Sequence, residues 1–303
     1  MRSGVLNLLK PPGMTSSDAV LAVRRLFGQK RVGHTGTLDP GAAGVLPICL
    51  GRATRLFDYL VEKDKTYLAE IRFGAETDTL DSYGHILAEG DYRVPAEALE
   101  ALLPAFLGEQ EQRAPMYSAL KSGGKKLYEL ARAGAPAVEK RRQICIYSLS
   151  LLEQTGPGAF LLEIRCSRGT YVRSLCRDLG QALGVPAYLS FLLRSQSGAF
   201  CLEEAHTLEE LQAHKEAGSL DTLLISPEKA LAHLEDVRLV LDRKDRLHLY
   251  NGAPVQFPGW EALPKGEPLR TYVQGQFWGL SAARETGLQM CLFLQDEENM
   301  GHG

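Results

Sequence analysis

The spacing of apolar residues along the chain predicts both strands and helices. Residues 65–73 (KTYLAEIRF) alternate between apolar and polar side chains, which is the period of a half-buried strand. Residues 159–166 (AFLLEIRC) form a second apolar strand segment. Helices are indicated where apolar residues recur every three or four positions. The expected helices begin near Thr15, Ala53, Pro95 and Val172.

The pattern changes near residue 231. From there, short apolar runs alternate with turns, including a Gly-Ala-Pro turn at 252–254 and a hairpin turn near Gly275. This pattern indicates a small, separate β-rich domain.

Acidic and basic residues are unevenly distributed along the chain, whose formal net charge is −3. Residues 1–72 contain 11 Lys/Arg against 6 Asp/Glu, and residues 113–177 contain 12 against 4. If the fold brings these two segments onto one face, that face would attract a polyanion. The alternative is that they are ordinary solvated helix faces with no such role. Within the second segment, residues 113–142 interleave tyrosines with lysines around a Gly-Gly pair, which favours a mobile arm over a core element.

Composition excludes several classes of protein. Of the 303 residues, 45% are hydrophobic and 23% are charged, as is typical of a soluble globular chain. No apolar run approaches the roughly 20 residues of a membrane helix, and the N-terminus lacks the apolar region of a secretory signal. The six cysteines form no C-x-x-C pair, so neither a zinc site nor a disulfide framework is indicated. We expect a protein of a reducing cytoplasm.

The loop GHTGTLDP at residues 33–40 is the most unusual local sequence. Its small, polar residues make a poor core but let a large partner approach the backbone. They surround one acid, Asp39, which Pro40 biases toward an extended backbone. Because Asp before Pro is also a good helix N-cap, a structural role is an equal alternative. The chain contains no P-loop, dinucleotide-binding, H-E-x-x-H or G-x-S-x-G motif, so an enzyme of this sequence would work without a bound metal or nucleotide cofactor.

Three further side chains are candidates for chemistry or binding. Arg173 lies in the first turn of its helix, where a cation opposes the helix dipole unless an anion pairs with it. Asp39 or a phosphate is a suitable partner, and a solvated arginine is the alternative. Tyr67 lies on the apolar face of its strand, so packing is its simplest role, although a tyrosine at a pocket rim can stack on a base. His34, taken alone, is more often structural than catalytic.

Five segments follow one another in an informative order. They are KPPGMTS at 10–16, GHTGTLDPGAAGVLP at 33–47, KTYLAEIRFGAETDTLDSYG at 65–84, YSALKSGGKKLYELARAG at 117–134 and CSRGTYVRSLCRDLG at 166–180. In sequence and spacing they resemble motifs of the bacterial tRNA pseudouridine synthase B (TruB) family, from about residue 5 to 200. The C-terminal part is similar only in kind to a PUA-like domain. Departures from the family pattern occur at Leu9, Gly41, Ala43, Ala114 and Leu193.

This resemblance implies an α+β fold with three parts. Residues 1–230 would form a pseudouridine synthase catalytic domain, with a mixed, mainly antiparallel central sheet flanked by helices. Residues 113–142 would be a basic, RNA-contacting thumb inserted into that domain. Residues 231–303 would be a PUA-like RNA-binding domain.

The resemblance also implies a reaction: isomerisation of uridine 55 in the T-loop of tRNA to pseudouridine, after base flipping and without a cofactor or metal. By resemblance, Asp39 would be the catalytic aspartate, Tyr67 the tyrosine at the target base and Arg173 the arginine paired with the aspartate. His34 would help to hold the flipped-out nucleotide, and Leu192 would line the uracil pocket. Other expected RNA contacts are Lys10, Asp81, Lys121, Lys125, Lys126, Arg132, Arg141 and Arg142. The partner would be the tRNA T-stem-loop, bound by a monomer with no obligatory protein partner and no membrane.

Three other functions remain open from the sequence. A non-catalytic RNA-binding or tRNA-folding protein would explain the basic segments, but not Asp39, Tyr67 and Arg173 in their motifs. A guide-dependent RNA pseudouridine synthase would be expected to carry partner-binding extensions, whereas this chain begins almost at its first motif. A glycosidase-type hydrolase would need two nearby carboxylates, for which Asp39 would pair with Asp78 or Asp81.

Overall fold

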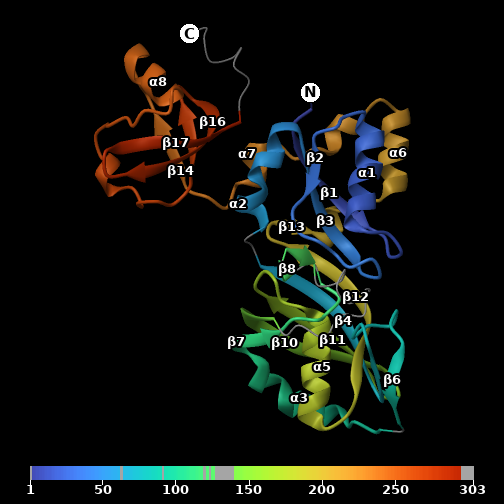
Figure 1. Cartoon of the computed structure of the whole chain (residues 1–303). Helices are drawn as coiled ribbons and strands as arrows, with labels where there is room; N and C mark the ends of the chain where they lie inside the picture. Colours follow the sequence, from blue (N-terminus) through green and yellow to red (C-terminus); the bar gives the residue numbers. More distant parts are fainter. Residues whose placement is uncertain are drawn as a thin grey trace.

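The fold is α+β, built on one long mixed sheet and a separate four-stranded sheet near the C-terminus (Figure 1). The computed structural model describes residues 2–61, 64–90, 92–118, 121–122, 124–126 and 140–294. The strands of the long sheet are β1 (Gly4–Lys10), β2 (Val32–His34), β3 (Ala43–Leu50), β4 (Lys65–Phe73), β7 (Gly108–Arg113), β10 (Arg141–Gly156), β11 (Ala159–Cys166), β12 (Ala187–Ser197) and β13 (Phe200–Cys201).

The long sheet has the order β1-β3-β12-β4-β11-β10-β7, with β2 paired to β3 and β13 paired to β12. The pair β3–β12 is parallel, through Leu193 opposite Ala43 and Arg194 opposite Gly44. The other pairs are antiparallel. The predicted α+β fold with a mixed, mainly antiparallel sheet flanked by helices is therefore confirmed.

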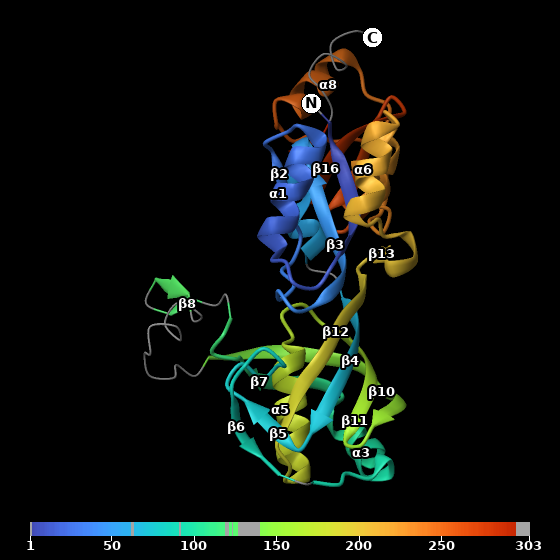
Figure 2. The same cartoon turned by 90° about the vertical axis from the view of Figure 1, so that its right-hand side faces the viewer.

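The N-terminal half of the sheet is covered on both faces, because successive apolar residues of its strands point to opposite faces and both sets are buried. Leu6 and Leu8 of β1 pack with α1 (Ser16–Phe27) and α6 (Leu208–Glu216). Val5, the residue before Leu6, packs on the other face with Ala53 and Leu56. Figure 2 shows α1 and α6 side by side over β1 and β3.

Helix α1 begins where the sequence predicts it, at a cap formed by Thr15. The Thr15 side chain accepts a hydrogen bond from the Asp18 N–H, and the Asp18 carboxylate accepts one from the Thr15 N–H. The helix ends at Gly28, whose φ of +62° is unstrained only for glycine.

The second half of the sheet has its own core. Helices α3 (Ala96–Leu102) and α5 (Val172–Leu183), with the 3₁₀ turn η2 (Leu103–Phe106), pack on β4, β10 and β11. Two side chains, Tyr67 of β4 and Leu192 of β12, pack against the cores of both halves. The junction of the halves therefore lies along the paired strands β4 and β12 (Figure 1).

The C-terminal sheet has the order β14-β15-β16-β17 and packs against the first half of the molecule. Its strands are β14 (Asp236–Leu239), β15 (Leu269–Val273), β16 (Gln276–Arg284) and β17 (Gly287–Phe293), with helix α8 (Arg243–Tyr250) beside β17. Leu280 and Leu292 share a core with Val5 and Leu56. The turn predicted near Gly275 joins β15 to β16.

The remaining described elements are short. They are η1 (Gly51–Leu56), α2 (Phe57–Val61), β5 (Ala75–Thr77), β6 (Ile86–Glu89), β8 (Lys121–Ser122), β9 (Lys125–Lys126), η3 (Leu202–Glu204), η4 (Leu220–Leu223), α7 (Pro227–Ala230) and η5 (Trp260–Ala262). The single helix predicted from about Ala53 to Val61 is thus a 3₁₀ turn followed by a short α-helix. Among the described residues, no helix has the length and apolar character needed to cross a membrane.

Candidate active site

A cavity of about 860 Å³ lies at the junction between the two halves of the long sheet. The N-terminal half contributes residues from 12–17 and 34–43, and the second half contributes residues from 79–83 and 117–118, together with Arg173. Residues 189–192 of β12 complete the wall. Such concave, largely apolar sites with a few convergent polar groups are the usual places for ligand binding.

Asp39 lies on the loop between β2 and β3 and faces this cavity. The residues after it form a turn, closed by the Ala42 N–H donating to the Asp39 carbonyl at 3.1 Å, and no helix follows. The interpretation of Asp39 as a helix N-cap is therefore wrong. Its carboxylate is free of a capping role and available for other partners.

Three buried side chains hold this loop from behind. Ser16 donates through Oγ to the Leu38 carbonyl at 3.0 Å and accepts from the Leu38 N–H at 2.9 Å. Lys10 Nζ donates to the Pro40 carbonyl at 3.3 Å. Arg194 donates to the carbonyls of Gly36 and Val45, at 3.3 and 2.8 Å. These contacts fix the backbone on both sides of Asp39.

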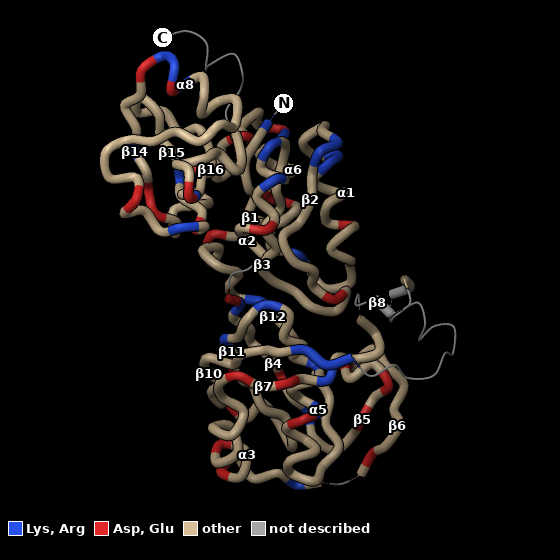
Figure 3. Tube along the Cα trace, turned by 60° about the vertical axis from the view of Figure 1, so that its left-hand side comes forward, with Lys and Arg blue, Asp and Glu red and all other residues tan. Residues whose placement is uncertain are grey.

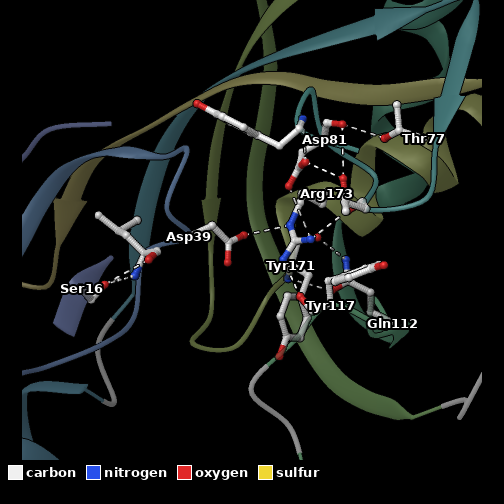
Figure 4. Close-up of polar contacts among 11 residues, drawn as sticks. Ser16, Asp39, Thr77, Asp81, Gln112, Tyr117, Tyr171 and Arg173 are labelled. Carbon is white, nitrogen blue, oxygen red and sulfur yellow. Dashed lines mark hydrogen bonds and ion pairs between the residues drawn. The ribbon is translucent and has the colours of Figure 1, made fainter. Parts of the chain in front are cut away.

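The partner of Asp39 is Arg173, from the first turn of α5 (Figure 4). Arg173 Nε lies 2.8 Å from Asp39 Oδ2, an ion pair whose angles are not those of an aligned hydrogen bond. The guanidinium is 5% exposed and the carboxylate 41% exposed. The arginine is therefore not solvated, and the pair presents its anionic side to the cavity.

The other nitrogens of Arg173 are also occupied, which fixes the plane of the guanidinium. Nη1 donates to the Thr79 carbonyl at 2.8 Å, and Nη2 donates to the Tyr117 carbonyl at 3.0 Å. Asp81 Oδ2 lies 3.6 Å from Nη1 and supplies a second negative charge. Asp81 is itself held by the Thr79 hydroxyl at 2.6 Å. Charge balance at the start of α5 thus comes from two carboxylates and not from solvent.

His34 lines the cavity at the end of β2. Burial lowers the pKa of its imidazole, and the positive charge of Arg194 lowers it further. The side chain is therefore neutral at pH 7. Its Nδ1 is buried and has no hydrogen-bond partner among the described residues.

Tyr67 is placed differently from the other candidates. It is half-buried and packs against both cores, as Leu192 does, but Leu192 lines the cavity and Tyr67 does not. Burial raises the pKa of its phenol, and Arg194, its partner in the β4–β12 register, acts in the opposite direction. The structure therefore brings Asp39, Arg173, His34 and Leu192 to one cavity, and Tyr67 is not among the residues that line it.

Two buried basic residues, Lys10 and Arg194, hold the loop that carries Asp39. This supporting role was not predicted from the sequence. Arg194 is 1% exposed and Lys10 is fully buried, with its ammonium also donating to the carbonyls of Pro11 and Met14. Burial lowers the pKa of Lys10 to about 8. Lys10 was expected to contact RNA, and its side chain is buried beneath the loop that carries Asp39. For Arg194, the available signal was one charged residue in an otherwise uncharged segment (LSFLLRS).

The basic residues expected to contact RNA divide into two groups. Arg141 and Arg142 begin β10, where Arg141 also faces Arg113 across the β7–β10 register (Figure 3). Arg141 forms an exposed ion pair with Glu111, and the Arg142 guanidinium lies 5.9 Å from the ring centroid of Tyr171. Arg132 and the side chains of Lys121, Lys125 and Lys126 lie outside the described residues.

Metal ligation finds no support in the described part of the chain. There, no group of three or more His, Cys, Asp or Glu side chains is arranged to hold a metal ion. The cysteines at positions 49, 145, 166, 176, 201 and 291 are free thiols. Burial raises the pKa of the Cys49 thiol to about 12 and that of Cys166 to about 11, which makes both unreactive at neutral pH.

Comparison with protein families gives two adjoining matches. Residues 24–172 match the family model "TruB family pseudouridylate synthase (N terminal domain)". Residues 173–232 match "tRNA pseudouridylate synthase B C-terminal domain". Together the two matches span well over half of the chain.

Individual proteins agree with these matches. The chain is similar to proteins named tRNA pseudouridine synthase B from Symbiobacterium thermophilum (54% identity, covering 70% of this chain and 72% of the relative), Pelotomaculum thermopropionicum (48%, 86% and 84%) and Geobacillus kaustophilus (43%, 91% and 98%). Among solved structures, it is similar to a chain of the archaeal box H/ACA sRNP Nop10-Cbf5 complex, with a TM-score of 0.71 and 24% identity over 99% of this chain and 88% of that one. The structural likeness shows a shared fold.

Proposed function

The chain belongs to the TruB family of pseudouridylate synthases, and from this premise we propose that it isomerises uridine 55 in the T-loop of tRNA to pseudouridine. It is a pseudouridine synthase, and its relatives are named for tRNA. The proposal adds the nucleotide, the residues and the way in which the nucleotide is reached.

One observation carries the proposal: a buried arginine holds one carboxylate at the wall of a cavity that is open to solvent. Arg173 is fixed by two main-chain carbonyls, so its Nε sets the position of Asp39 Oδ2. The remaining surface of the Asp39 carboxylate faces the cavity. We assign Asp39 as the catalytic residue and Arg173 as the residue that orients it.

The reaction needs no group from outside the substrate and the protein. The N1–C1′ bond of the uridine breaks, the uracil turns, and a C5–C1′ bond forms. The proton on C5 leaves and N1 gains one, so atoms and electrons balance without an oxidant or reductant. A carboxylate can assist by attacking C1′, by attacking C6 or by taking a sugar proton, and each route needs an oriented carboxylate beside the nucleotide.

The target base must leave its stack to reach Asp39, at a cost of a few kcal/mol. The cavity is lined by groups suited to hold it. Leu192 supplies an apolar contact, and the neutral His34 imidazole lies in the same wall. Tyr67 packs against the same two cores as Leu192, and we propose that it contacts the target base at this junction.

The outer RNA contacts follow from charge. Arg141 and Arg142 lie at the start of β10 and are the last two residues of the predicted thumb at 113–142. Arginines placed there would bind phosphates, position the RNA and leave recognition of the nucleotide to the cavity. We also propose the division into a catalytic domain, 1–230, and a PUA-like RNA-binding domain, 231–303.

Two alternatives are less well supported. A non-catalytic RNA-binding protein would gain nothing from an oriented carboxylate, whose negative charge disfavours RNA binding. A guide-dependent synthase would be expected to have its nearest resemblance among guide-dependent proteins. The proteins at 43–54% identity are named for tRNA, whereas the likeness to the Nop10-Cbf5 chain stands at 24%.

The test is to incubate the purified protein alone with an unmodified tRNA transcript and to map pseudouridine at single-nucleotide resolution. The proposal predicts one modified position, the T-loop uridine 55. A T-stem-loop hairpin should be modified at the same position, and a hairpin with cytidine there should not be modified. Modification elsewhere in the tRNA, or only after a guide RNA is added, would contradict the proposed target.

A further inference from the structure

The Tyr83 ring lies directly on Gly41, two residues after Asp39. A Cβ atom on Gly41 would overlap Cε2 of Tyr83 and lie 2.8 Å from Cδ2 and Cζ. Gly41 does not have a positive φ, so its backbone does not itself require glycine. A side chain at position 41 would therefore displace the aromatic ring that rests on it.

The turn that carries Tyr83 is fixed to the cavity wall. The Tyr83 N–H donates to Asp81 Oδ1 at 3.1 Å, and Asp81 is the second carboxylate beside Arg173. The Ser82 N–H donates to the Leu189 carbonyl of β12 at 3.1 Å. Leu80 has a φ of +63°, which a leucine adopts only when its surroundings hold it there. The Tyr83 ring is thus presented from a rigid turn.

Two large aromatic side chains are exposed in the lining of the cavity. Tyr83 is 70% exposed and Phe191, on β12, is 46% exposed. In the part of the chain that the structure describes, neither ring is paired with another ring or with a cation. Exposed aromatic faces beside a nucleotide site suit unpaired bases, because every base has a π-face that can stack.

We propose that Tyr83 and Phe191 form an aromatic platform on which unpaired bases of the RNA loop, next to the target nucleotide, stack. Gly41 is the residue that allows Tyr83 to lie beside Asp39. This inference rests on the proposed function, because it takes the cavity to be the site of an RNA loop. It adds two binding residues and a coupling between positions 41 and 83.

The test uses the full-length protein and T-stem-loop hairpins with 2-aminopurine on either side of the target uridine. Stacking on an aromatic side chain quenches 2-aminopurine fluorescence, so the readout reports stacking and not binding alone. The variants are Tyr83→Ala, Tyr83→Phe, Phe191→Ala and Gly41→Ala. Tyr92→Ala is the matched control, because Tyr92 is another exposed tyrosine ring resting on a glycine, Gly90, but does not line the cavity.

We expect Tyr83→Ala and Phe191→Ala each to relieve quenching at one flanking position and to weaken binding about 5- to 100-fold. Tyr83→Phe and the control Tyr92→Ala should retain both the quenching and the binding affinity of the wild type. Gly41→Ala should displace the ring and resemble Tyr83→Ala, and the double variant should be no weaker than Tyr83→Ala alone.

The outcomes separate this inference from the proposed function. Suppose that the wild-type protein forms pseudouridine in the hairpin, and that Tyr83→Ala and Phe191→Ala each quench 2-aminopurine as strongly as the wild type. The platform is then wrong and the proposed function stands. If the wild-type protein binds and quenches but forms no pseudouridine, the platform stands and the proposed function is wrong. A protein that neither binds nor modifies the hairpin overturns both.

Discussion

Arg173 Nε lies 2.8 Å from Asp39 Oδ2, across 134 positions of sequence and across the junction between the two halves of the long sheet. Each partner is fixed by its own half of the molecule. Arg173 is held by Thr79 and Tyr117, and the loop of Asp39 by Ser16, Lys10 and Arg194. The relative position of the halves therefore sets the position of the carboxylate.

A first prediction concerns Arg173→Lys, which keeps the charge but loses the three-directional guanidinium. A lysine ammonium cannot contact Asp39 and both carbonyls in the geometry described here. We expect the single-turnover rate on a tRNA transcript to fall by at least about 100-fold, with a smaller effect on binding. A normal rate in Arg173→Lys, with circular dichroism confirming the fold, would show that charge alone suffices.

A second prediction concerns Ser16→Ala and stability. The Ser16 hydroxyl satisfies both the N–H and the carbonyl of the buried residue Leu38, so removing it leaves two buried main-chain groups unpaired. We expect the free energy of unfolding to fall by about 1–3 kcal/mol in urea denaturation. Ser17→Ala, at the exposed neighbouring position, should change it by less than about 0.5 kcal/mol. Equal effects of the two substitutions would remove the assigned role of Ser16.

A third prediction concerns Lys10 and pH. The pKa of Lys10 is lowered from 10.5 to about 8 by burial, so between these values the unfolded chain binds a proton that the folded chain has released. This group therefore makes the protein more stable as pH rises from about 8 to 10.5. Lys10→Met removes this titrating group. Between about pH 8 and 10.5, the slope of the free energy of unfolding against pH should therefore be smaller in Lys10→Met by up to about 1.4 kcal/mol per pH unit. Parallel stability curves for the wild type and Lys10→Met would contradict the assigned pKa.

A fourth prediction concerns the basic residues at the start of β10. If Arg142 binds a phosphate, Arg142→Gln should reduce the slope of log Kd for tRNA against log salt concentration by about 1. Arg93→Gln is the matched control, because Arg93 is exposed near the start of α3 and outside the cavity. Slopes that are unchanged in both variants would exclude Arg142 as a phosphate contact.

Local sequence pattern was sufficient for some elements and not for others. The strand at 65–73 and the helix after Thr15 were predicted because their periodicity or capping residues are explicit. The strands β3 and β12 were not singled out. In β3, every residue from Gly44 to Leu50 is buried, so polar and apolar positions do not alternate. The helix predicted over 53–61 begins as a 3₁₀ turn, because apolar spacing of three is common to both helix types.

The site could be predicted only in part, because its contacts join residues that lie far apart in the sequence. Local sequence marks Asp39 as unusual, but its pairing with Arg173 depends on how the two halves meet. The helix dipole left Asp39 or a phosphate as the partner of Arg173, and only family resemblance selected Asp39. Ser16 and Arg194 act on the main chain of a distant loop, a role that no local pattern reveals. Tyr67 was expected at the target base; it packs against both cores and is absent from the cavity lining, and its contact with the base stays a prediction.

The most direct test of the central claim is tritium release from a tRNA transcript labelled at C5 of uridine, under single-turnover conditions, with the wild type and Asp39→Asn. Formation of the C5–C1′ bond expels the C5 tritium into water, so the assay follows the bond change itself. We predict one tritium released per tRNA by the wild type, and a rate at least about 1,000-fold lower for Asp39→Asn with binding retained. Release by Asp39→Asn at a rate near that of the wild type would contradict the assignment of Asp39 as the catalytic residue.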